Sequence, residues 1–112
     1  MSTIFEQILN KSIPCDFIYE DDYCVAFNDI EPQAPVHCLL IPKQKLVNLK
    51  DANSDNEHVL GKLMSAIPKV TDIICPGQDF RIVVNNGANA SQTVFYLHIH
   101  ILSGRKFNWP PG

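Results

Sequence analysis

The alternation of apolar and polar residues is clearest near the C-terminus, over the run from Phe95 to Leu102. Successive side chains of a β-strand point to opposite faces of its sheet. In a strand over this run, one face is uniformly apolar and the other carries Tyr96, His98 and His100. The pattern therefore predicts a half-buried strand with two imidazoles side by side, and its polar face is the first candidate for a functional site.

Four other short runs have the β-branched and aromatic composition of strands and are bounded by turn residues. They are Asp16–Glu20, Tyr23–Asn28, His37–Ile41 and Phe80–Asn85. Asp21-Asp22 predicts a tight hairpin between the first two runs. The prolines within Glu31–Pro35 exclude that segment from a sheet interior, so we expect a connecting loop there.

Two helices are predicted from apolar residues that recur every three or four positions. Thr3 is a suitable N-cap for the first, which extends to about Lys11. Ser54 and Glu57 match a capping box that opens a longer helix, and Pro68 within its apolar stripe predicts a kink or a break into two pieces. Helices packed against strands that are joined mainly by short turns indicate an α+β fold. No repeat or linker divides the chain, so we expect one domain over residues 1–112.

Composition restricts the classes of function without choosing among them. The net charge of −3 and the lack of clustered lysine and arginine argue against binding to nucleic acid. No apolar run approaches the ~20 residues that span a bilayer, and no signal pattern opens the chain, so we expect no membrane association. A soluble protein of the cytoplasm is the expectation, and presence in the nucleus is compatible with it. The four cysteines are far apart and are expected to be reduced structural thiols.

Several separate motifs resemble the histidine triad (HIT) family, and in particular its nucleotide-binding branch. The run Ser91–Leu102 is similar to the family signature, in which three histidines alternate with apolar residues. The segment Asp29–Pro35, then His37–Lys43, and the terminal Trp109-Pro110-Pro111-Gly112 match that branch in the same order. The resemblance covers the chain from about Thr3 to Gly112. It departs from the signature at the first triad histidine, which is Tyr96 here.

The resemblance implies a HIT-like fold, with a five-stranded antiparallel sheet, a short N-terminal helix and one long, Pro-kinked helix. It also implies a homodimer in which the sheet continues from one subunit into the other. Pairing of this kind removes an exposed sheet edge from each subunit. The tail 105–112, with Trp109, is then expected to reach toward the active site of the partner.

The same resemblance implies a nucleotide hydrolase or transferase that cleaves purine nucleoside phosphoramidates, of the adenosine 5′-monophosphoramidase type. His98 occupies the position of the nucleophile, and a neutral imidazole attacks phosphorus without first losing a proton. His100 and Thr93 are expected to contact the phosphate oxygens and to help protonate the leaving group, with His37 as a partner behind them. The scheme needs no metal and no other cofactor.

A purine nucleoside is expected to bind beside these histidines. By the resemblance, its base and ribose contact Phe27, Asn28, Asp29 and Ile30, and Asp29 accepts hydrogen bonds from the ribose hydroxyls. The loop before the histidine run is expected to hold the developing negative charge of the phosphate through Gln92 and its backbone amides. The remaining nucleotide-binding candidates are Asn85, Ser91, Thr93, His98, His100 and Trp109.

Two other functions stay open. Tyrosine, with an ordinary pKa near 10, carries no exchangeable charge at neutral pH. Tyr96 is therefore compatible either with slowed catalysis or with a purine nucleotide-binding module that has little or no turnover. In a metal enzyme, His98 and His100 would be ligands with His37 as a third, but that reading leaves Asp29 and the tail without a role.

Overall fold

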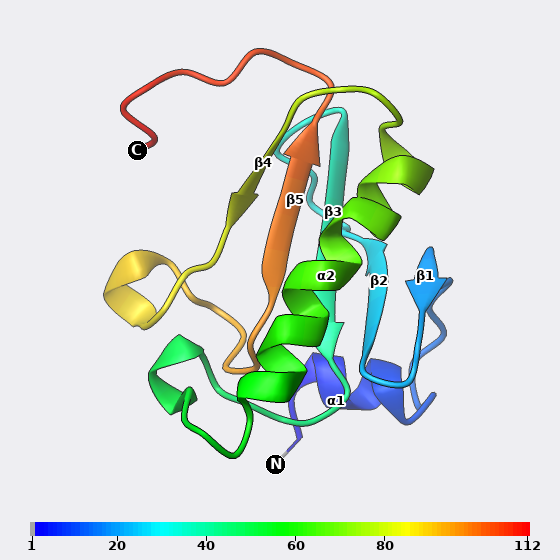
Figure 1. Ribbon diagram of the computed structural model, residues 1–112, viewed down its shortest axis with the longest axis vertical. Helices are drawn as coiled ribbons and strands as arrows, with labels where there is room; N and C mark the ends of the chain where they lie inside the picture. Colours follow the sequence, from blue (N-terminus) through cyan, green and yellow to red (C-terminus); the bar gives the residue numbers. More distant parts are fainter. Residues whose placement is uncertain (1) are drawn as a thin grey trace.

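The computed structural model describes residues 2–112, whose strands form one antiparallel sheet in the order β1-β2-β3-β5-β4 (Figure 1). The strands are β1 (Tyr19–Glu20), β2 (Cys24–Asn28), β3 (Val36–Pro42), β4 (Phe80–Val83) and β5 (Ile99–Ser103). The α-helices are α1 (Ile4–Leu9) and α2 (Glu57–Ile74), and short 3-10 helices span Leu49–Asp51 and Ala88–Ala90. The predicted α+β class and five-stranded antiparallel sheet are confirmed.

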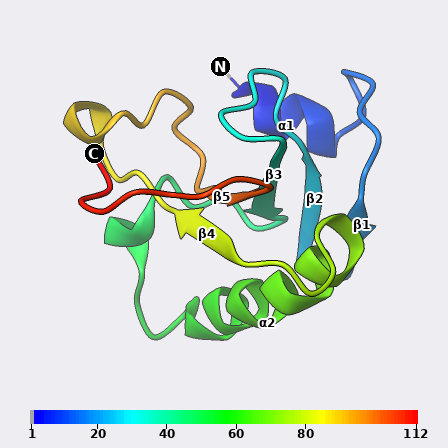
Figure 2. The ribbon, with the colours of Figure 1, turned by 90° about the horizontal axis from the view of Figure 1, so that it is seen from above.

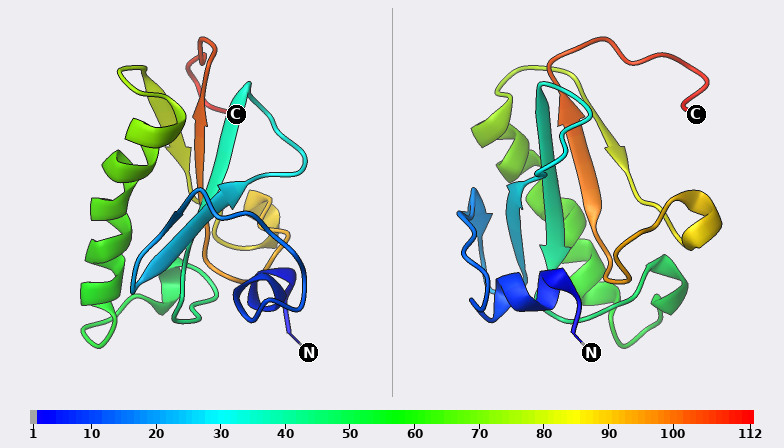
Figure 3. Two further views of the ribbon diagram at one scale, coloured as in Figure 1. Left: turned by 90° about the vertical axis from the view of Figure 1, so that its right-hand side faces the viewer. Right: turned by 180° about the vertical axis from the view of Figure 1, so that it is seen from behind.

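The sheet separates two apolar cores. The long helix α2 covers one face, and the short helix α1 lies against the other (Figures 2 and 3). The central strand β3 is buried on both sides, so that Leu40 packs in the core under α2 while Leu39 packs in the core under α1. Because α1 is short, it covers only part of its face of the sheet, and the histidines lie at the boundary, with His98 packed against Phe5 of α1.

The alternation in the histidine run is confirmed, although the regular part of β5 begins at Ile99 and not at Phe95. Leu97 and Ile99 belong to the core under α2, whereas Tyr96 belongs to the core under α1. The segment before β5 is held by a hydrogen bond from the Leu97 N–H to the Leu46 carbonyl, at 2.7 Å. Packing therefore preserves the two faces even where ladder hydrogen bonds are missing.

The first helix cap is confirmed and the second is wrong. The Thr3 hydroxyl accepts from the Glu6 N–H while the Glu6 carboxylate accepts from the Thr3 N–H, which is a capping box. The helix ends at Leu9, slightly before the expected Lys11. Helix α2 begins after Asn56, so Ser54 is not its N-cap.

Pro68 does not break α2, which runs as one helix from Glu57 to Ile74. Pro68 lies on the exposed side of the helix, and so does Met64, whose carbonyl would otherwise accept a hydrogen bond from residue 68. The apolar face of α2 on both sides of Pro68, with Leu63 and Val70, is packed in the core and holds the helix together across the proline. The predicted break into two pieces is therefore wrong.

The chain between residues 2 and 112 contains no helix that is both long and apolar enough to cross a bilayer. Its four cysteines are free thiols, and Cys24, Cys38 and Cys75 are buried. Burial raises the pKa of the Cys24 and Cys38 thiols to about 12, so both stay protonated at neutral pH. This agrees with the expectation of structural cysteines.

Gly104 connects β5 to the tail with a φ of +93°, and a Cβ at this position would lie 2.8 Å from the Cβ of Pro35. We expect Gly104→Ala to lower the free energy of unfolding by ~2 kcal/mol, because it combines backbone strain with a close contact. Urea denaturation measures the change. The control is Gly61→Ala on the exposed face of α2, where a Cβ meets open space and should stabilise by ~1 kcal/mol. Equal stability of Gly104→Ala and the wild type would contradict the expectation.

Candidate active site

His98 lies just before β5 and is 6% exposed. Its Nδ1 is 2.7 Å from the backbone carbonyl of Tyr96, which can only accept, so Nδ1 carries the proton. The ring of Phe5 in α1 packs edge-on against the imidazole, with centroids 5.1 Å apart. His98 is thereby fixed as the tautomer whose Nε2 has a free lone pair, which is the form required of a nucleophile.

A second chain of hydrogen bonds fixes His37 and His100. The Gln33 backbone N–H donates to His37 Nδ1 at 2.9 Å, so a neutral His37 carries its proton on Nε2. His37 Nε2 is 2.8 Å from His100 Nδ1 and donates to it. His100 in turn must carry its own proton on Nε2. Each tautomer follows from the one before it, and the chain ends in an N–H donor on His100 next to His98.

The electrostatic environment keeps both of these imidazoles neutral. Burial and, to a smaller extent, the neighbouring His98 and His37 lower the pKa of His100 to about 4, against the opposing effect of the Asp29 carboxylate. Burial also lowers the pKa of His37, against the opposing effect of the Asp29 carboxylate, whose Oδ2 lies 3.4 Å from His37 Nε2. The rings of His98 and His100 are 4.9 Å apart between centroids. At neutral pH the site therefore offers a lone pair and an N–H donor side by side, with no charge on His100.

The histidines open into a cavity of about 500 Å³ between α1, the ends of β2 and β3 and the segment before β5. Its lining includes His37, His98, His100 and Thr93, together with a largely apolar wall from α1 and β2. Phe27 is buried in that wall, whereas Ile30 stands at the rim and is 88% exposed. The lining residues identified within 2–112 include two acidic side chains and no lysine or arginine. An anion bound there must be held by imidazole, hydroxyl and backbone N–H groups.

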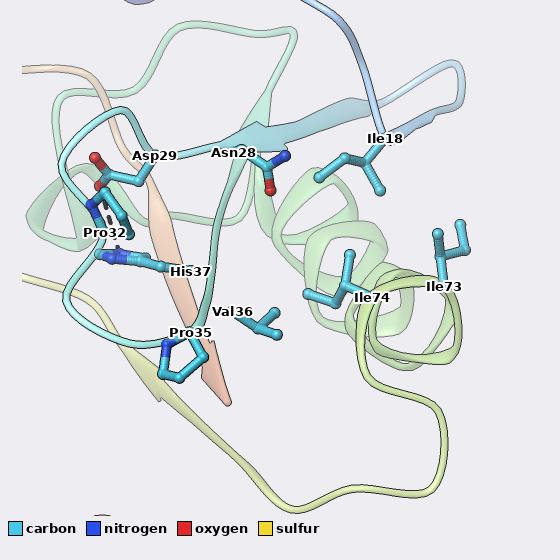
Figure 4. Close-up of a pocket in the computed structure, with 9 residues that line it drawn as sticks. All are labelled: Ile18, Asn28, Asp29, Pro32, Pro35, Val36, His37, Ile73 and Ile74. Atoms are coloured by element: carbon cyan, nitrogen blue, oxygen red, sulfur yellow. Dashed lines mark ion pairs between the residues drawn. The ribbon is translucent and has the colours of Figure 1, made fainter. Parts of the chain in front are cut away.

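A second cavity of about 490 Å³ adjoins the first (Figure 4). It shares Asn28, Asp29 and His37 with the histidine cavity and is closed on its other side by Ile73 and Ile74 at the end of α2. Figure 4 shows the Asp29 carboxylate paired with His37, while the Asn28 amide turns away from this pair toward Ile74. The two predicted neighbours, Asn28 and Asp29, thus face different surroundings.

The predicted site residues separate into two groups. Residues that line the histidine cavity are Phe27, Asn28, Asp29, Ile30, Thr93, His37, His98 and His100. Asn85, Ser91, Gln92 and Trp109 line neither cavity of the described chain. Trp109 is 82% exposed and lies beside Arg81 of β4, with 6.0 Å between the guanidinium carbon and the ring centroid.

Gln92 has a different role from the expected contact to phosphate. Its side chain is buried, and its amide donates to the carbonyls of Val47 and Val94. Its oxygen accepts from the Asn48 amide at 3.0 Å and from the Gly87 N–H at 2.8 Å. All these bonds go to protein groups, so Gln92 joins the loop before β5 to the segment after β3. In this arrangement its side-chain amide is fully engaged within the protein.

Two functional contacts were not foreseen from the sequence. Phe5 was assigned only to an apolar helix face, which is a local signal that does not say what the face covers. The Gln33 N–H, which sets the tautomer of His37, is a backbone group, so the type of residue at position 33 gives no sign of it.

The hydroxyl of Tyr96 points away from the histidines and donates to the Pro42 carbonyl.

Asp29, His37 and His100 have ligand atoms within 4.8 Å of one another, a set that resembles a metal site. His98, which the metal-enzyme hypothesis requires as a ligand, is outside this set. His37 and His100 already satisfy each other through a hydrogen bond that binding of a metal would break. The donors present therefore fit a chain of neutral histidines at least as well as a metal.

A family model described as the HIT domain matches residues 10–107. Among curated relatives, an uncharacterized HIT-like protein of Synechocystis is 51% identical over 110 residues, which is 98% of this chain and 96% of that protein. The Arabidopsis thaliana protein named adenylylsulfatase HINT1 is 43% identical over 112 residues, which is 98% of this chain and 76% of that protein.

Solved structures agree with these matches. A HIT family hydrolase from Legionella pneumophila is 34% identical and has a TM-score of 0.93, covering 99% of this chain and 100% of its own. A histidine triad protein from Clostridium difficile is 37% identical with a TM-score of 0.86, covering 96% of this chain and 95% of its own. The predicted HIT-like fold is confirmed.

The neutral state of His100 makes stability depend on pH. Its pKa is about 4 in the folded protein, against an ordinary value of 6.5. Between these values the unfolded chain binds a proton that the folded protein does not, so stability is present above pH 6.5 and is lost as pH falls toward 4, by up to ~1.4 kcal/mol per pH unit. His37, whose pKa is also lowered, adds in the same direction.

Urea denaturation between pH 4 and 7 tests this linkage. We expect His100→Gln to flatten the dependence, because glutamine does not titrate. His58→Gln, on the exposed side of α2, is the control that should keep the wild-type slope. The same slope in wild type and His100→Gln would show that His100 does not carry the effect.

Proposed function

Because this chain belongs to the HIT domain family, we propose that it is a nucleotide hydrolase that cleaves purine nucleoside phosphoramidates through a covalent nucleotidyl-histidine on His98. One observation carries the proposal: the free Nε2 of His98 and the Nε2–H of His100 face one cavity, each fixed by a hydrogen bond on the other side of its ring. A nucleophile and a neutral hydrogen-bond donor are thereby available at the same pH.

The reaction proceeds in two displacements. His98 Nε2 attacks the α-phosphorus, an N–P bond to the imidazole forms, and the P–N bond to the leaving amine breaks. His100 stays neutral and donates a hydrogen bond from Nε2–H to a phosphoryl oxygen, while the departing amine takes up a proton from solvent in the cavity and the attacking water later returns one to solvent. Water breaks the bond between phosphorus and His98, which releases the nucleoside monophosphate and restores the free imidazole.

The bond between His37 and His100 orients this donor. His37 Nε2–H donates to His100 Nδ1, which leaves the proton of His100 on Nε2. The Asp29 carboxylate, 3.4 Å from His37 Nε2, favours this orientation of the His37 N–H electrostatically. Asp29 also accepts from the Glu31 N–H at 2.8 Å and retains acceptor capacity for ribose hydroxyls.

The charge of the cavity supports a substrate with a single phosphate. A phosphoramidate monoester carries one negative charge, which imidazole, the Thr93 hydroxyl and backbone N–H groups can hold. A polyphosphate would bring several charges toward Asp29 and Glu31 without a lysine or arginine among the lining residues described. The apolar wall with Phe27, and Ile30 at the rim, suit a planar purine. The relative named adenylylsulfatase suggests that a sulfate leaving group be tested beside an amine.

A homodimer is part of the proposal. Strand β4 ends the sheet, and its Phe80 and Ile82 side chains are 43% and 36% exposed. Arg81 on the same strand donates to the Asn108 carbonyl at 3.0 Å and so directs the tail 105–112 along this edge. A second copy paired at β4 would cover these side chains and give the exposed Trp109 a surface to contact.

The first test is release of a fluorogenic amine from an adenosine 5′-phosphoramidate with a metal chelator present. We expect turnover by the wild type and only background release by His98→Ala, because the nucleophile is missing. His58→Ala on α2 is the control and should keep full activity. Turnover by His98→Ala at the wild-type rate would contradict the covalent mechanism. Tight binding of the monophosphate by an inactive wild type would instead identify a nucleotide-binding module.

Sedimentation velocity at micromolar concentration tests the dimer. We expect the wild type to sediment as a dimer and Ile82→Lys to sediment as a monomer, because two buried charges would face each other across the pairing. Ile73→Lys, at a 55% exposed position of α2 away from β4, is the control and should leave the dimer intact. A monomeric wild type would remove this part of the proposal.

A further inference from the structure

We propose that Tyr96 is a positioning residue for His98, which it holds through its backbone carbonyl and through a hydroxyl anchored at the end of β3. The inference rests on the proposed function and concerns the position at which this chain departs from the family signature. On this proposal, the replacement of the first triad histidine by Tyr96 is not a loss of function at that position. It is a replacement that acts on the nucleophile through main-chain groups.

The carbonyl of Tyr96 provides the contact that matters most to the nucleophile. It accepts the Nδ1–H of His98 at 2.7 Å and thereby selects the tautomer with a free Nε2. Every residue type has this carbonyl, so the bond survives exchange of histidine for tyrosine. What the side chain decides is how firmly the carbonyl is held in place.

The side chain of Tyr96 is 1% exposed and extends through the core under α1. Its hydroxyl donates to the carbonyl of Pro42, with the Lys43 carbonyl at 3.3 Å as a second acceptor. Burial raises the pKa of Tyr96 to about 12, so the hydroxyl keeps its proton and remains a donor. The anchor joins the segment before β5 to the last residues of β3.

The same anchor reaches α1, which covers the nucleophile. Lys45, just beyond the anchored residues, pairs with Glu6 of α1 at 3.0 Å. The Phe5 ring, next to Glu6, meets Tyr96 at 6.2 Å and His98 at 5.1 Å between centroids, both edge-on. Tyr96, the turn after β3, α1 and His98 thus form a closed path of contacts. Loosening one member loosens the cover over the imidazole.

An imidazole at position 96 would not perform this task. It ends well short of the phenol oxygen, so the Pro42 carbonyl would lose its donor and the core under α1 would gain a void. Restoring the family signature with Tyr96→His is therefore expected to lower kcat below the wild-type value. If Tyr96 instead marked the loss of a catalytic group, Tyr96→His would raise turnover above the wild-type value.

The kinetic test compares Tyr96→Phe, Tyr96→His and Tyr19→Phe with the wild type. Tyr96→Phe removes only the hydroxyl, and kcat should fall about 5-fold, which is ~1 kcal/mol at 1.36 kcal/mol per tenfold, with the Kd for AMP within about twofold. Tyr19→Phe is the matched control: its hydroxyl also donates a hydrogen bond, to Asp21 at 2.7 Å, away from the site, and its loss should leave kcat unchanged. Faster turnover by Tyr96→His than by the wild type would overturn the inference, and so would an unchanged kcat in Tyr96→Phe.

Nitrogen NMR of the ligand-free protein gives a readout that does not depend on turnover. With ¹⁵N-labelled histidine, His98 should show a single tautomer protonated on Nδ1 in the wild type and in Tyr19→Phe, and a mixture of tautomers in Tyr96→Phe. A single tautomer in all three proteins would refute the positioning role. If the wild type hydrolyses no phosphoramidate, the proposed function fails, but this measurement still decides the role of Tyr96.

Discussion

The antiparallel pairing of β3 with β5 is the constraint on which the site depends. Its register places Leu39 opposite His100 and His37 opposite Leu102, so that two histidines 63 residues apart come within hydrogen-bonding distance. A slip of one residue would turn His100 into the core under α2 and Ile101 out of it. Burial of Ile99 and Ile101 under α2 therefore sets the geometry of the histidines on the opposite face.

Burial and chemistry act together at this face. Removal of His100 from water favours the uncharged imidazole, and a neutral imidazole is both a hydrogen-bond donor and an acceptor. The backbone supplies the two ends of the arrangement, an N–H of Gln33 at His37 and a carbonyl of Tyr96 at His98. The groups that fix both tautomers belong to the main chain and are kept when tyrosine stands at position 96, and the anchored phenol of Tyr96 holds the carbonyl that His98 needs in place.

Much of the fold was predictable from the sequence, and so were the histidines and Asp29 of the cavity, whereas Glu31 and Gln33 also line it and were not predicted. Alternation in the histidine run defined both faces correctly, and Thr3 was correctly identified as the N-cap of α1. Errors arose where local signals compete. Ser54 matched a cap motif, but α2 begins after Asn56. Pro68 matched a helix break, but it lies on the solvent-facing side of α2, which continues through it as one helix. The hydrogen bonds of Gln92 to Val47 and Asn48 could not be predicted, because the sequence does not show that those residues lie beside it.

The sequence by itself determined which face of each element is apolar, because side-chain hydrophobicity and the period of a strand or helix are local properties. It also determined that His98 and His100 share a face. Only the tertiary structure decided which nitrogen of each histidine carries the proton, where the hydroxyl of Tyr96 is anchored and what Phe5 covers. These properties depend on hydrogen bonds and ring contacts between distant segments, whose geometry is fixed only when the register of the sheet and the packing of α1 are both in place.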